Sequence, residues 1–398
     1  MPASSSLWLV VRWEGLEPSR LAAHGPQPCL SANSSTSANS RIIIIPTGLS
    51  RKRALSKRNV VTCIVVDAMG SDAYPVPDVA GAILAARQYH VEIILVGDET
   101  IVGPALAAGL PGVLPIRLVH APEMLSMTDK GEDLTFKARH KQALNSMAVG
   151  MDLVKSGQAD AFVTAGNTGA AMVTALLRLG RIRGVDRPAV APIFPTATGS
   201  CVALDIGANP DCKPENLVQF AIMGSVYAKN VRGVSNPRVG LVSNGEEDGK
   251  GNELVKATAP LLKKSGLNYY GNVEGKDVIE GKVDVAVTDG FVGNVMLKTA
   301  EAVGKLILDE VRAAIKNGGP LAMLGGFLVR PALRKIKKLL DPSEQGAAIL
   351  LGVNGLVLIG HGRSDAIAIK NAVRLASSAA ESDVLGAIRT AIENNLKS

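Results

Sequence analysis

The stretch CIVVD, residues 63–67, is one of seven short apolar runs in the chain. Each run stops at a small, acidic or amide residue and precedes a helical pattern or a Gly-rich turn. Strands that alternate with helices in this way form a mostly parallel sheet covered by helices on both faces, an α/β fold. Ligands of such sheets bind at the carboxyl ends of the strands, so we expect the chemistry in the loops that follow the runs. The other runs are EIILVGD (92–98), AFVTAGN (161–167), CVALDIG (201–207), VGLVSN (239–244), DVAVTD (284–289) and LVLIGHG (356–362).

The composition excludes several classes of function. With 398 residues, 47% of them apolar, the chain can bury a large core. Most of its formal charge of +7 lies in residues 1–60, which contain eight Lys or Arg and two Glu, and aromatic residues are only 3%. We therefore expect no nucleic-acid partner. Four cysteines without metal or disulfide spacing suit a reducing cytosol, and no apolar stretch is long enough to span a bilayer.

Residues 1–59 are predicted to be a disordered extension. The segment SANSSTSANS lies between PQP and RKRALSKR and has no sustained helical or strand period. The stretch GLEPSRLAAHGPQPCLS resembles translated non-coding DNA, and the first predicted strand begins at Val60, so we expect an over-extended start. The alternative is an organelle transit peptide, which shares this Arg- and Ser-rich, acid-poor composition.

Residues 60–398 are predicted to form a single domain, with helices at 78–89, 214–231 and 383–395 and a strand at 91–97. The α/β rhythm breaks at 318–342, GGPLAMLGGFLVRPALRKIKKLLDP, where apolar residues precede a basic amphipathic helix. This segment is predicted to be a protruding amphipathic helical hairpin that lies in a membrane surface with its cations toward anionic headgroups. The alternative is that its apolar stripe packs in a dimer interface.

Several catalytic signatures are missing from the sequence. No G-x-G-x-x-G follows a strand, NGEEDGKGNE lacks the pattern of a P-loop, and no G-x-S-x-G elbow occurs. No histidine pair has zinc spacing, so we expect neither a metal nor a cofactor. His361 in GHGRS is the one histidine placed for catalysis, and a loop histidine bonded to backbone is the alternative.

Two loops favour the binding of an anion. In TAGNTGAAM, residues 166–169 lie between a strand and a helix, so backbone N–H groups and the Thr168 hydroxyl can converge on phosphate. By itself Thr168 could equally be a helix cap. In DIGANPDCKPEN, Lys213 immediately precedes a helix N-terminus, where a cation is unfavourable unless an anion separates it from the helix dipole. Pairing of Lys213 with Asp211 or Glu215 is the alternative.

Two further loops follow later strands. NGEEDGKGNE, residues 244–253, can be a solvated turn or a flexible loop whose Lys250 reaches a phosphate. TDGFVGNV, residues 288–295, can direct Asp289, Gly290 and Asn294 at a ligand while Phe291 closes over it. Four such loops together are far more specific than one.

These segments resemble the bacterial phosphate acyltransferase family. The resemblance rests on DAMGSD, AGNTGA, ALDIGANPDCKPENLVQFAIMGSVYA, SNGEEDGKGNELVK, VTDGFVGNVMLKT and LLGVNGLVLIGHGRSDAIAIKNA, and it covers about residues 60–395. It implies a phosphotransacetylase and isocitrate-dehydrogenase-like fold and a homodimer. In this chain Ser71 replaces a glycine of the family's first loop, and Asn145 stands beside Ser146 where the family has paired serines.

The resemblance also implies the reaction, the partners and the site. The enzyme would convert acyl-acyl-carrier-protein and inorganic phosphate into acyl phosphate, which a membrane glycerol-3-phosphate acyltransferase would use for phospholipid synthesis. It would be cytoplasmic and peripherally bound to the inner face of the cell membrane. Phosphate is itself a nucleophile and a thiol is a good leaving group, so the reaction needs neither a triad nor a metal.

We assign expected roles to the loop residues. Lys213 and the 166–169 N–H groups would hold phosphate, Asn244 or Asn294 would donate to the oxyanion, and His361 or Lys250 would protonate the thiolate. A short-chain phosphotransacylase that uses acyl-coenzyme A, or a catalytically silent membrane scaffold, are the competing hypotheses. The remaining residues expected to bind phosphate or substrate are Asp67, Gly70, Gly166, Asn167, Thr168, Gly169, Asp205, Asn209, Asp289, Gly290 and Phe291.

Overall fold

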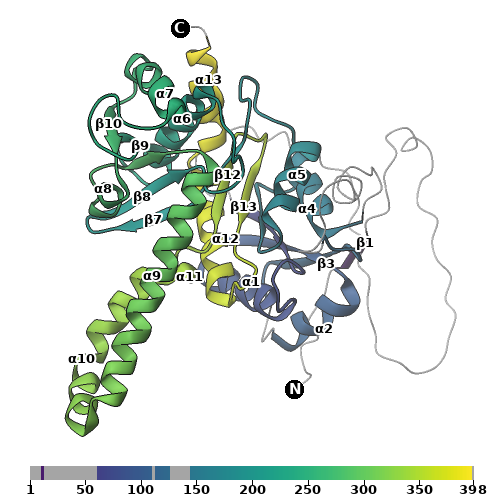
Figure 1. Cartoon of the computed structure of the whole chain (residues 1–398). Helices are drawn as coiled ribbons and strands as arrows, with labels where there is room; N and C mark the ends of the chain where they lie inside the picture. Colours follow the sequence, from purple (N-terminus) through teal and green to yellow (C-terminus); the bar gives the residue numbers. More distant parts are fainter. Residues whose placement is uncertain (1–9, 13–60, 110–112, 126–143, 397–398) are drawn as a thin grey trace, which may run out of the picture.

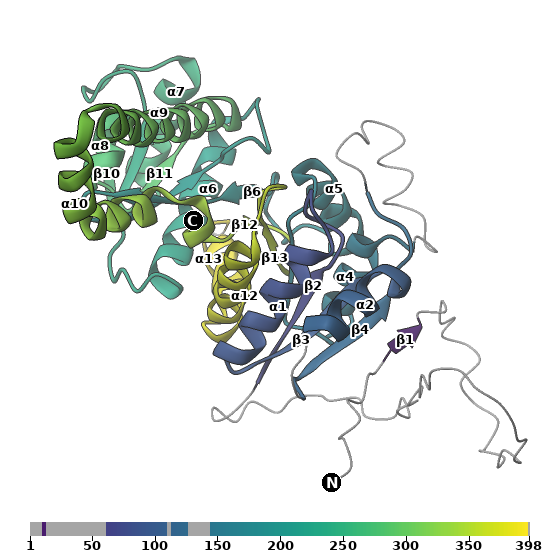
Figure 2. The same cartoon turned by 90° about the horizontal axis from the view of Figure 1, so that it is seen from below.

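The strands of the molecule form two sheets that lie side by side (Figure 1, Figure 2). The computed structural model describes residues 10–12, 61–109, 113–125 and 144–396, without the side chains of 10–12, 337 and 340. The first sheet has the order β1 (Val10–Arg12), β4 (Ile116–His120), β3 (Val91–Gly97), β2 (Thr62–Asp67), β5 (Ala161–Thr164), β13 (Leu356–Ile359), β12 (Ala348–Leu351), β6 (Ala189–Ala191). The second has the order β10 (Tyr269–Val273), β9 (Val239–Val242), β11 (Val285–Val287), β8 (Gly199–Leu204), β7 (Ile193–Thr196).

All seven predicted apolar runs form strands, namely β2, β3, β5, β8, β9, β11 and β13, and the prediction of a mostly parallel arrangement is confirmed. The antiparallel pairs are confined to β12 with its neighbours β13 and β6, and to β7 with β8. The chain passes from one sheet to the other at Pro192, between β6 and β7. Proline lacks the N–H that a continuous ladder would require, which suits an interruption at this point.

Helices cover both faces of each sheet, as the sequence predicts. On the first sheet, α1 (Val76–Gln88) and α12 (Ala366–Glu381) cover one face, and α4 (Ser146–Lys155) and α5 (Thr168–Arg178) cover the other. On the second sheet, α6 (Pro214–Asn230) and α7 (Glu253–Lys264) cover one face, and α8 (Gly275–Glu280) and the start of α9 (Gly290–Asn317) cover the other. The remaining helices are α2 (Glu99–Gly109), α10 (Gly319–Leu340), α11 (Pro342–Gln345) and α13 (Val384–Asn395).

One buried apolar cluster runs beneath both sheets. It contains Ile64 and Ile369 from the first sheet and its helices, and Phe220, Leu241 and Val285 from the second. Helix α13 packs against α6 and α12 and so helps to join the two halves. The two sheets therefore share a hydrophobic core.

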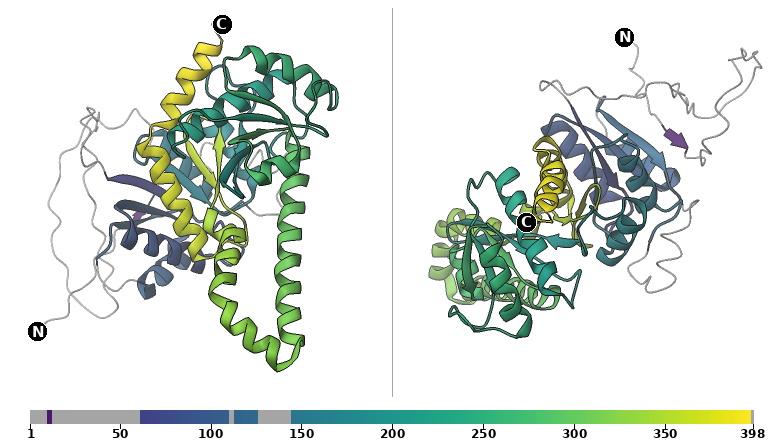
Figure 3. Two further views of the ribbon diagram at one scale, coloured as in Figure 1. Left: turned by 90° about the vertical axis from the view of Figure 1, so that its left-hand side faces the viewer. Right: turned by 90° about the horizontal axis from the view of Figure 1, so that it is seen from above.

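Helices α9 and α10 form a hairpin that protrudes from the body (Figure 1, Figure 3). Segment 318–342 was expected to form the hairpin by itself, but it supplies only the turn, α10 and the start of α11, and α9 is the other arm. The difference arises because α9 continues for 28 residues, well beyond its contacts with the second sheet.

The predicted bounds of the other elements match the structure within two residues. The helices expected at 78–89, 214–231 and 383–395 are α1, α6 and α13, and the strand expected at 91–97 is β3. Within the predicted extension, residues 10–12 pair in parallel with β4 as an edge strand. The rest of residues 1–59 lies outside the described residues, so the disordered extension and the single domain 60–398 stay predictions.

Candidate functional site

The loops that follow β2 and β5 lie directly against each other. A Cβ atom at Gly70 would stand 2.8 Å from Oγ1 of Thr164 and 2.9 Å from the backbone nitrogen of Ala165. A Cβ atom at Gly166 would stand 3.6 Å from Cα of Gly70. Glycine is therefore required at position 70, because a side chain there would collide with the backbone of the 165–166 loop.

Asp67 fixes these two loops from beneath. Its carboxylate accepts hydrogen bonds from the Thr164 hydroxyl at 2.8 Å and from the backbone nitrogen of Met69 at 3.1 Å. The Ser146 hydroxyl also bonds to Asp67. Burial raises the pKa of Asp67, and these hydrogen bonds oppose the rise. Asp67, which we expected to bind phosphate or substrate, is buried and bonded within the protein, so the structure places it as a support of the loops.

The start of α5 presents free backbone donors on this side of the molecule. Asn167 caps the helix by accepting a hydrogen bond from the backbone nitrogen of Ala170 at 3.1 Å, while Thr168 and Gly169 are exposed. Within the described residues, no hydrogen bond engages the N–H groups of Thr168 and Gly169. The geometry is that of a helix N-terminus open to an anion.

The loop after β13 lies beside the loops that follow β2 and β5. The backbone nitrogen of Gly360 donates to the carbonyl of Thr164, and that of Asp72 donates to the carbonyl of Gly362, both at 2.7 Å. His361 therefore lies beside the 68–72 loop and is exposed. Its Nδ1 atom accepts a hydrogen bond from the backbone nitrogen of Arg363 at 3.3 Å. This is the contact expected if His361 is a loop histidine bonded to backbone, the alternative to a catalytic role.

In the second sheet, Asp205 joins the loop after β8 to the start of α9. The Asp205 carboxylate accepts hydrogen bonds from the backbone nitrogens of Val190 at 3.1 Å and Asn209 at 2.6 Å, and from Nδ2 of Asn209 at 3.0 Å. The backbone nitrogen of Gly290 donates to the carbonyl of Asn209 at 2.8 Å, and a Cβ atom at Gly290 would meet Asp205 at 2.9 Å. Burial raises the pKa of Asp205 against these hydrogen bonds. Asp205 and Asn209, both expected to touch substrate, are buried and use their polar groups within the protein.

Lys213 stands at the N-cap of α6 and is exposed. No ion pair joins it to Asp211, Glu215 or another acid of the described residues, so the alternative that it pairs with its neighbours is wrong for this structure. The neighbouring Cys212 thiol has its pKa raised to about 11, first by burial and then by the charges of Asp205 and Asp289. Cys212 is thus a protonated thiol at neutral pH and not a nucleophile.

The structure also places three further predicted residues, Asn294, Phe291 and Lys250. The Asn294 side chain lies within 3.8 Å of the Cβ position of Gly207. Phe291 is 65% exposed, so it does not cover a ligand in this structure. The stem of Lys250 lies against Gly245, and its side chain is exposed.

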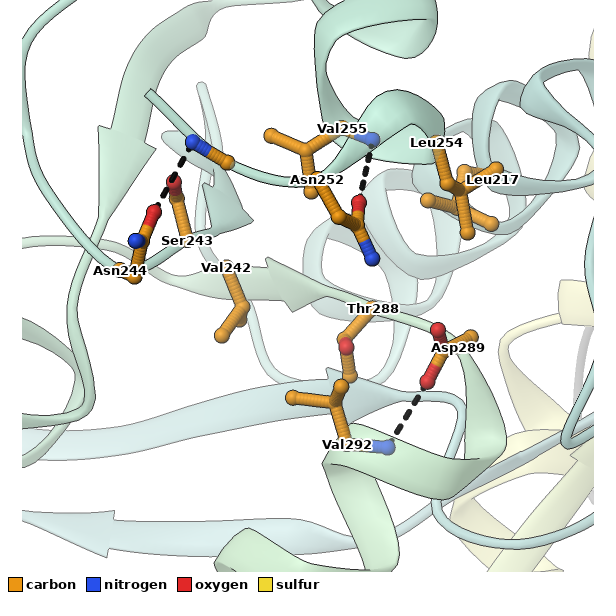
Figure 4. Close-up of a pocket in the computed structure, with 11 residues that line it drawn as sticks. Leu217, Val242, Ser243, Asn244, Asn252, Leu254, Val255, Thr288, Asp289 and Val292 are labelled. Carbon is orange, nitrogen blue, oxygen red and sulfur yellow. Dashed lines mark hydrogen bonds between the residues drawn. The ribbon is translucent and has the colours of Figure 1, made fainter.

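A pocket of about 440 Å³ lies at the carboxyl ends of β9 and β11 (Figure 4). The first turns of α7 and α9 form part of its wall. Asn252 caps α7 through the backbone nitrogen of Val255 at 2.9 Å, and Asp289 caps α9 through that of Val292 at 2.8 Å. Eleven residues line the pocket: Leu217, Val242, Ser243, Asn244, Gly251, Asn252, Leu254, Val255, Thr288, Asp289 and Val292.

The structure brings only two of the predicted site residues, Asn244 and Asp289, into this pocket. Asn244 accepts a hydrogen bond from the backbone nitrogen of Gly251 at 2.9 Å, which closes the 244–251 loop. Sequence reasoning did not single out Ser243, Thr288 or Asn252. The first two immediately precede predicted residues, and an Asn before an acidic helical turn is a recognisable cap signal.

One group of acids approaches metal-ligand geometry within the described part of the chain. Ligand atoms of Glu246, Glu274 and Asp277 lie within 4.8 Å of one another. Lys282 lies 2.6 Å from Asp277 and 3.5 Å from Glu246, and Lys276 lies 2.8 Å from Glu274. The two ammonium groups offset two of the three carboxylate charges, and they tie the 244–251 loop to α8.

Comparisons with known proteins agree with this description. The sequence model of the family described as Fatty acid synthesis protein matches residues 62–386. A phosphate acyltransferase of Pelotomaculum thermopropionicum is 48% identical over 331 residues, which cover 83% of this chain and 95% of that protein. The chain belongs to the phosphate acyltransferase family. A phosphate acyltransferase of Synechococcus elongatus is 47% identical over 325 residues, covering 81% and 92% of the two chains.

Solved structures support the fold of this phosphate acyltransferase chain. Phosphotransacetylases from Staphylococcus aureus and Streptococcus pyogenes superpose with TM-scores of 0.55 and 0.54. Each is 17% identical in sequence, and each comparison covers 80% of this chain and 94% of the solved one. The predicted phosphotransacetylase-like fold is confirmed, and at this identity the similarity concerns the fold alone.

Proposed function

We propose that this member of the phosphate acyltransferase family transfers the acyl group of acyl-acyl-carrier-protein to inorganic phosphate. A phosphate oxygen attacks the thioester carbonyl carbon, a carbon–oxygen bond forms and the carbon–sulfur bond breaks. The proton of the phosphate ends on the thiol of the carrier protein. Acyl phosphate and the free carrier protein are the products.

The arrangement of charge and backbone donors supports positions for the phosphate. Lys213 is an unpaired cation at one helix N-terminus, and Thr168 and Gly169 offer free N–H groups at another. Ile206 and Ala208, from the loop that leads to Lys213, pack against the same cluster as Ala170 of α5. Phosphate capture by both elements would require the N-terminus of α5 and Lys213 to lie on the same side of this cluster.

The observation that carries the proposal is the pocket to which Leu217, in the first turns of α6, contributes. Its wall combines apolar side chains with hydroxyl and amide groups at the carboxyl ends of β9 and β11, which is where ligands of parallel sheets bind. Asn244 in the pocket or Asn294 beside Gly207 would donate to the oxyanion. His361 or Lys250 would protonate the departing thiolate.

One assay tests the reaction. Purified protein is incubated with palmitoyl-acyl-carrier-protein and radiolabelled phosphate, and labelled acyl phosphate is trapped with hydroxylamine and counted. We expect product from the carrier-protein thioester and at least tenfold less from acetyl-coenzyme A. The fold shared with phosphotransacetylases supports the competing short-chain activity, and equal or greater product from acetyl-coenzyme A would establish it instead. If neither donor gives acyl phosphate, the hypothesis of a catalytically silent membrane scaffold is favoured.

We further propose a peripheral position at the inner face of the cell membrane, where a membrane glycerol-3-phosphate acyltransferase would consume the acyl phosphate. No helix in the described ranges has both the length and the apolarity to cross a membrane. The hairpin supports surface binding, because apolar side chains such as Leu321, Phe327 and Leu328 are 68–82% exposed and basic residues follow them. A homodimer formed through this hairpin is the competing use of the same surface.

A further inference from the structure

The pocket beneath the 244–251 loop has two chemically different walls. Leu217, Val242, Leu254, Val255 and Val292 supply an apolar wall (Figure 4). The other lining residues include Ser243, Asn244, Asn252 and Thr288, which carry hydroxyl or amide groups. A ligand that fits both walls has aliphatic segments interrupted by neutral hydrogen-bonding groups.

The charge of the lining does not suit inorganic phosphate. None of the eleven lining residues is a cation, and Asp289 is a carboxylate. Each of the two helix N-termini, of α7 and α9, contributes about half a positive charge, and the carboxylate of Asp289 cancels the sum of about one. Phosphate would gain little electrostatic stabilisation in this pocket, because the carboxylate of Asp289 would repel it. A neutral ligand does not experience this repulsion.

Two hydroxyls in the pocket have no hydrogen-bond partner among the described residues. Oγ of Ser243 is buried and forms no hydrogen bond, and Gly251 covers it so closely that a Cβ atom there would lie 3.2 Å away. Thr288 is buried too, and no hydrogen bond engages its hydroxyl within the described residues. Buried polar groups without partners are costly, so a ligand that bonds to them is stabilised.

We infer that this pocket holds the neutral pantetheine arm of the acyl donor, with its amides bonded to Ser243 and Thr288, and that phosphate binds outside it. The inference rests on the proposed function and divides that site in two. The thioester arm enters between α7 and α9, and phosphate occupies the side of Lys213 and α5. Asp289, expected from the sequence to bind phosphate, instead caps α9 and keeps the anion out of the pocket.

Filling the pocket is the direct test. Val292→Trp places an indole among the lining residues, and Val295→Trp puts the same side chain on the same helix at an exposed position outside the lining. Binding of a non-reactive thioether analogue of palmitoyl-pantetheine is measured by calorimetry. We expect Val292→Trp to weaken binding at least tenfold and Val295→Trp to match the wild type. Equal binding by all three proteins would overturn the assignment.

A conservative variant separates the donor from phosphate. Ser243→Ala should weaken analogue binding about fivefold by removing one hydrogen bond, with KM for phosphate unchanged. Unchanged analogue binding together with a rise of fivefold or more in KM for phosphate would place phosphate in the pocket and reject the inference. Because calorimetry needs no turnover, a wild-type protein that binds the analogue but makes no acyl phosphate would contradict the proposed function alone.

Discussion

Lys213 is the residue whose position is hardest to explain by structure alone. It stands at the positive end of α6, where a cation costs about 0.3–1 kcal/mol, and no acid of the described residues pairs with it. A buried salt bridge or a packing role would account for such a placement, but the side chain is exposed. A bound anion removes the conflict.

Replacement of this lysine should therefore affect the reaction and not the fold. We expect Lys213→Ala to lower kcat/KM for phosphate by roughly 10²-fold, because one preorganised electrostatic donor is lost. Lys213→Arg should also be impaired, since a planar fork replaces a point charge. Lys229→Ala, at the other end of α6, is the matched control and should behave as the wild type. Unaltered phosphate dependence in Lys213→Ala would make this lysine an ordinary surface residue.

At the level of single residues, the sequence predicted which loops matter better than which side chains act. Asn244 and Asp289 were predicted and line the pocket, while their neighbours Ser243 and Thr288 were not. Successive residues after a strand point in different directions, and one-dimensional spacing does not say which of two adjacent polar groups faces a cavity. Asp67 and Asp205 were predicted to bind substrate because each is a polar residue at the end of a strand. That pattern is the same for a residue that contacts a ligand and for one that only holds its loop in place.

Among the elements, the hairpin of α9 and α10 carries the strongest surface signal. Many of its apolar side chains are exposed in the described chain, among them Leu324 and Phe327 at 59% and 68%. Replacing both with Glu should release the protein from anionic liposomes in a flotation assay and leave turnover of soluble acyl-carrier-protein substrate unchanged. Ile279→Glu, an exposed apolar position on α8, is the control. Retained liposome binding together with a shift from dimer to monomer in sedimentation would favour the interface instead.

The sequence predicted this element only in part, for a physical reason. The composition of 318–342 is unusual enough to stand out, but the apolar residues of α9 look like those of any amphipathic helix. What makes α9 an arm is the absence of a sheet beneath its second half, and only the tertiary arrangement reveals that. The antiparallel strands β7 (IFPT) and β12 (AILL) were not among the seven predicted runs.

For the whole molecule, buried carboxylates make stability depend on pH. Burial raises the pKa of Asp78 to about 7, opposed by the Ser71 hydroxyl that donates to it at 2.5 Å and reinforced by Asp67. The folded state thus holds a proton that the unfolded state has released, from about pH 4 up to about pH 7. Stability falls as pH rises through that window.

Replacement of the Asp78 carboxyl group should reduce the dependence of stability on pH. We expect Asp78→Asn, relative to the wild type, to gain roughly 3 kcal/mol in the free energy of unfolding between pH 5 and pH 7.5. Urea titrations at the two pH values measure the difference, and Asp98→Asn is the control, at a partly exposed carboxylate whose pKa is lowered by hydrogen bonds from Thr100. A constant difference between variant and wild type at both pH values would show that Asp78 is charged throughout.

The arrangement of the two sheets is the part of the whole fold that the sequence did not predict. Seven apolar runs identify strands, but their order along the chain does not state which strands pair. The chain changes sheets at Pro192, and the second sheet depends on the long-range pairing of β8 with β11. These two strands are separated in the chain by α6, β9, α7, β10 and α8.

Helix α9 begins with a cap in the pocket and ends at the turn of the hairpin, so one uninterrupted rod connects the two ends. At 1.5 Å per residue its 28 residues span about 42 Å. A tilt of about five degrees at its first turn would displace the far end by about 4 Å. The length of α9 therefore sets the distance between the pocket and any surface that the hairpin tip touches. Because the helix is continuous, a small change of its direction at Asp289 would produce a larger displacement of the tip.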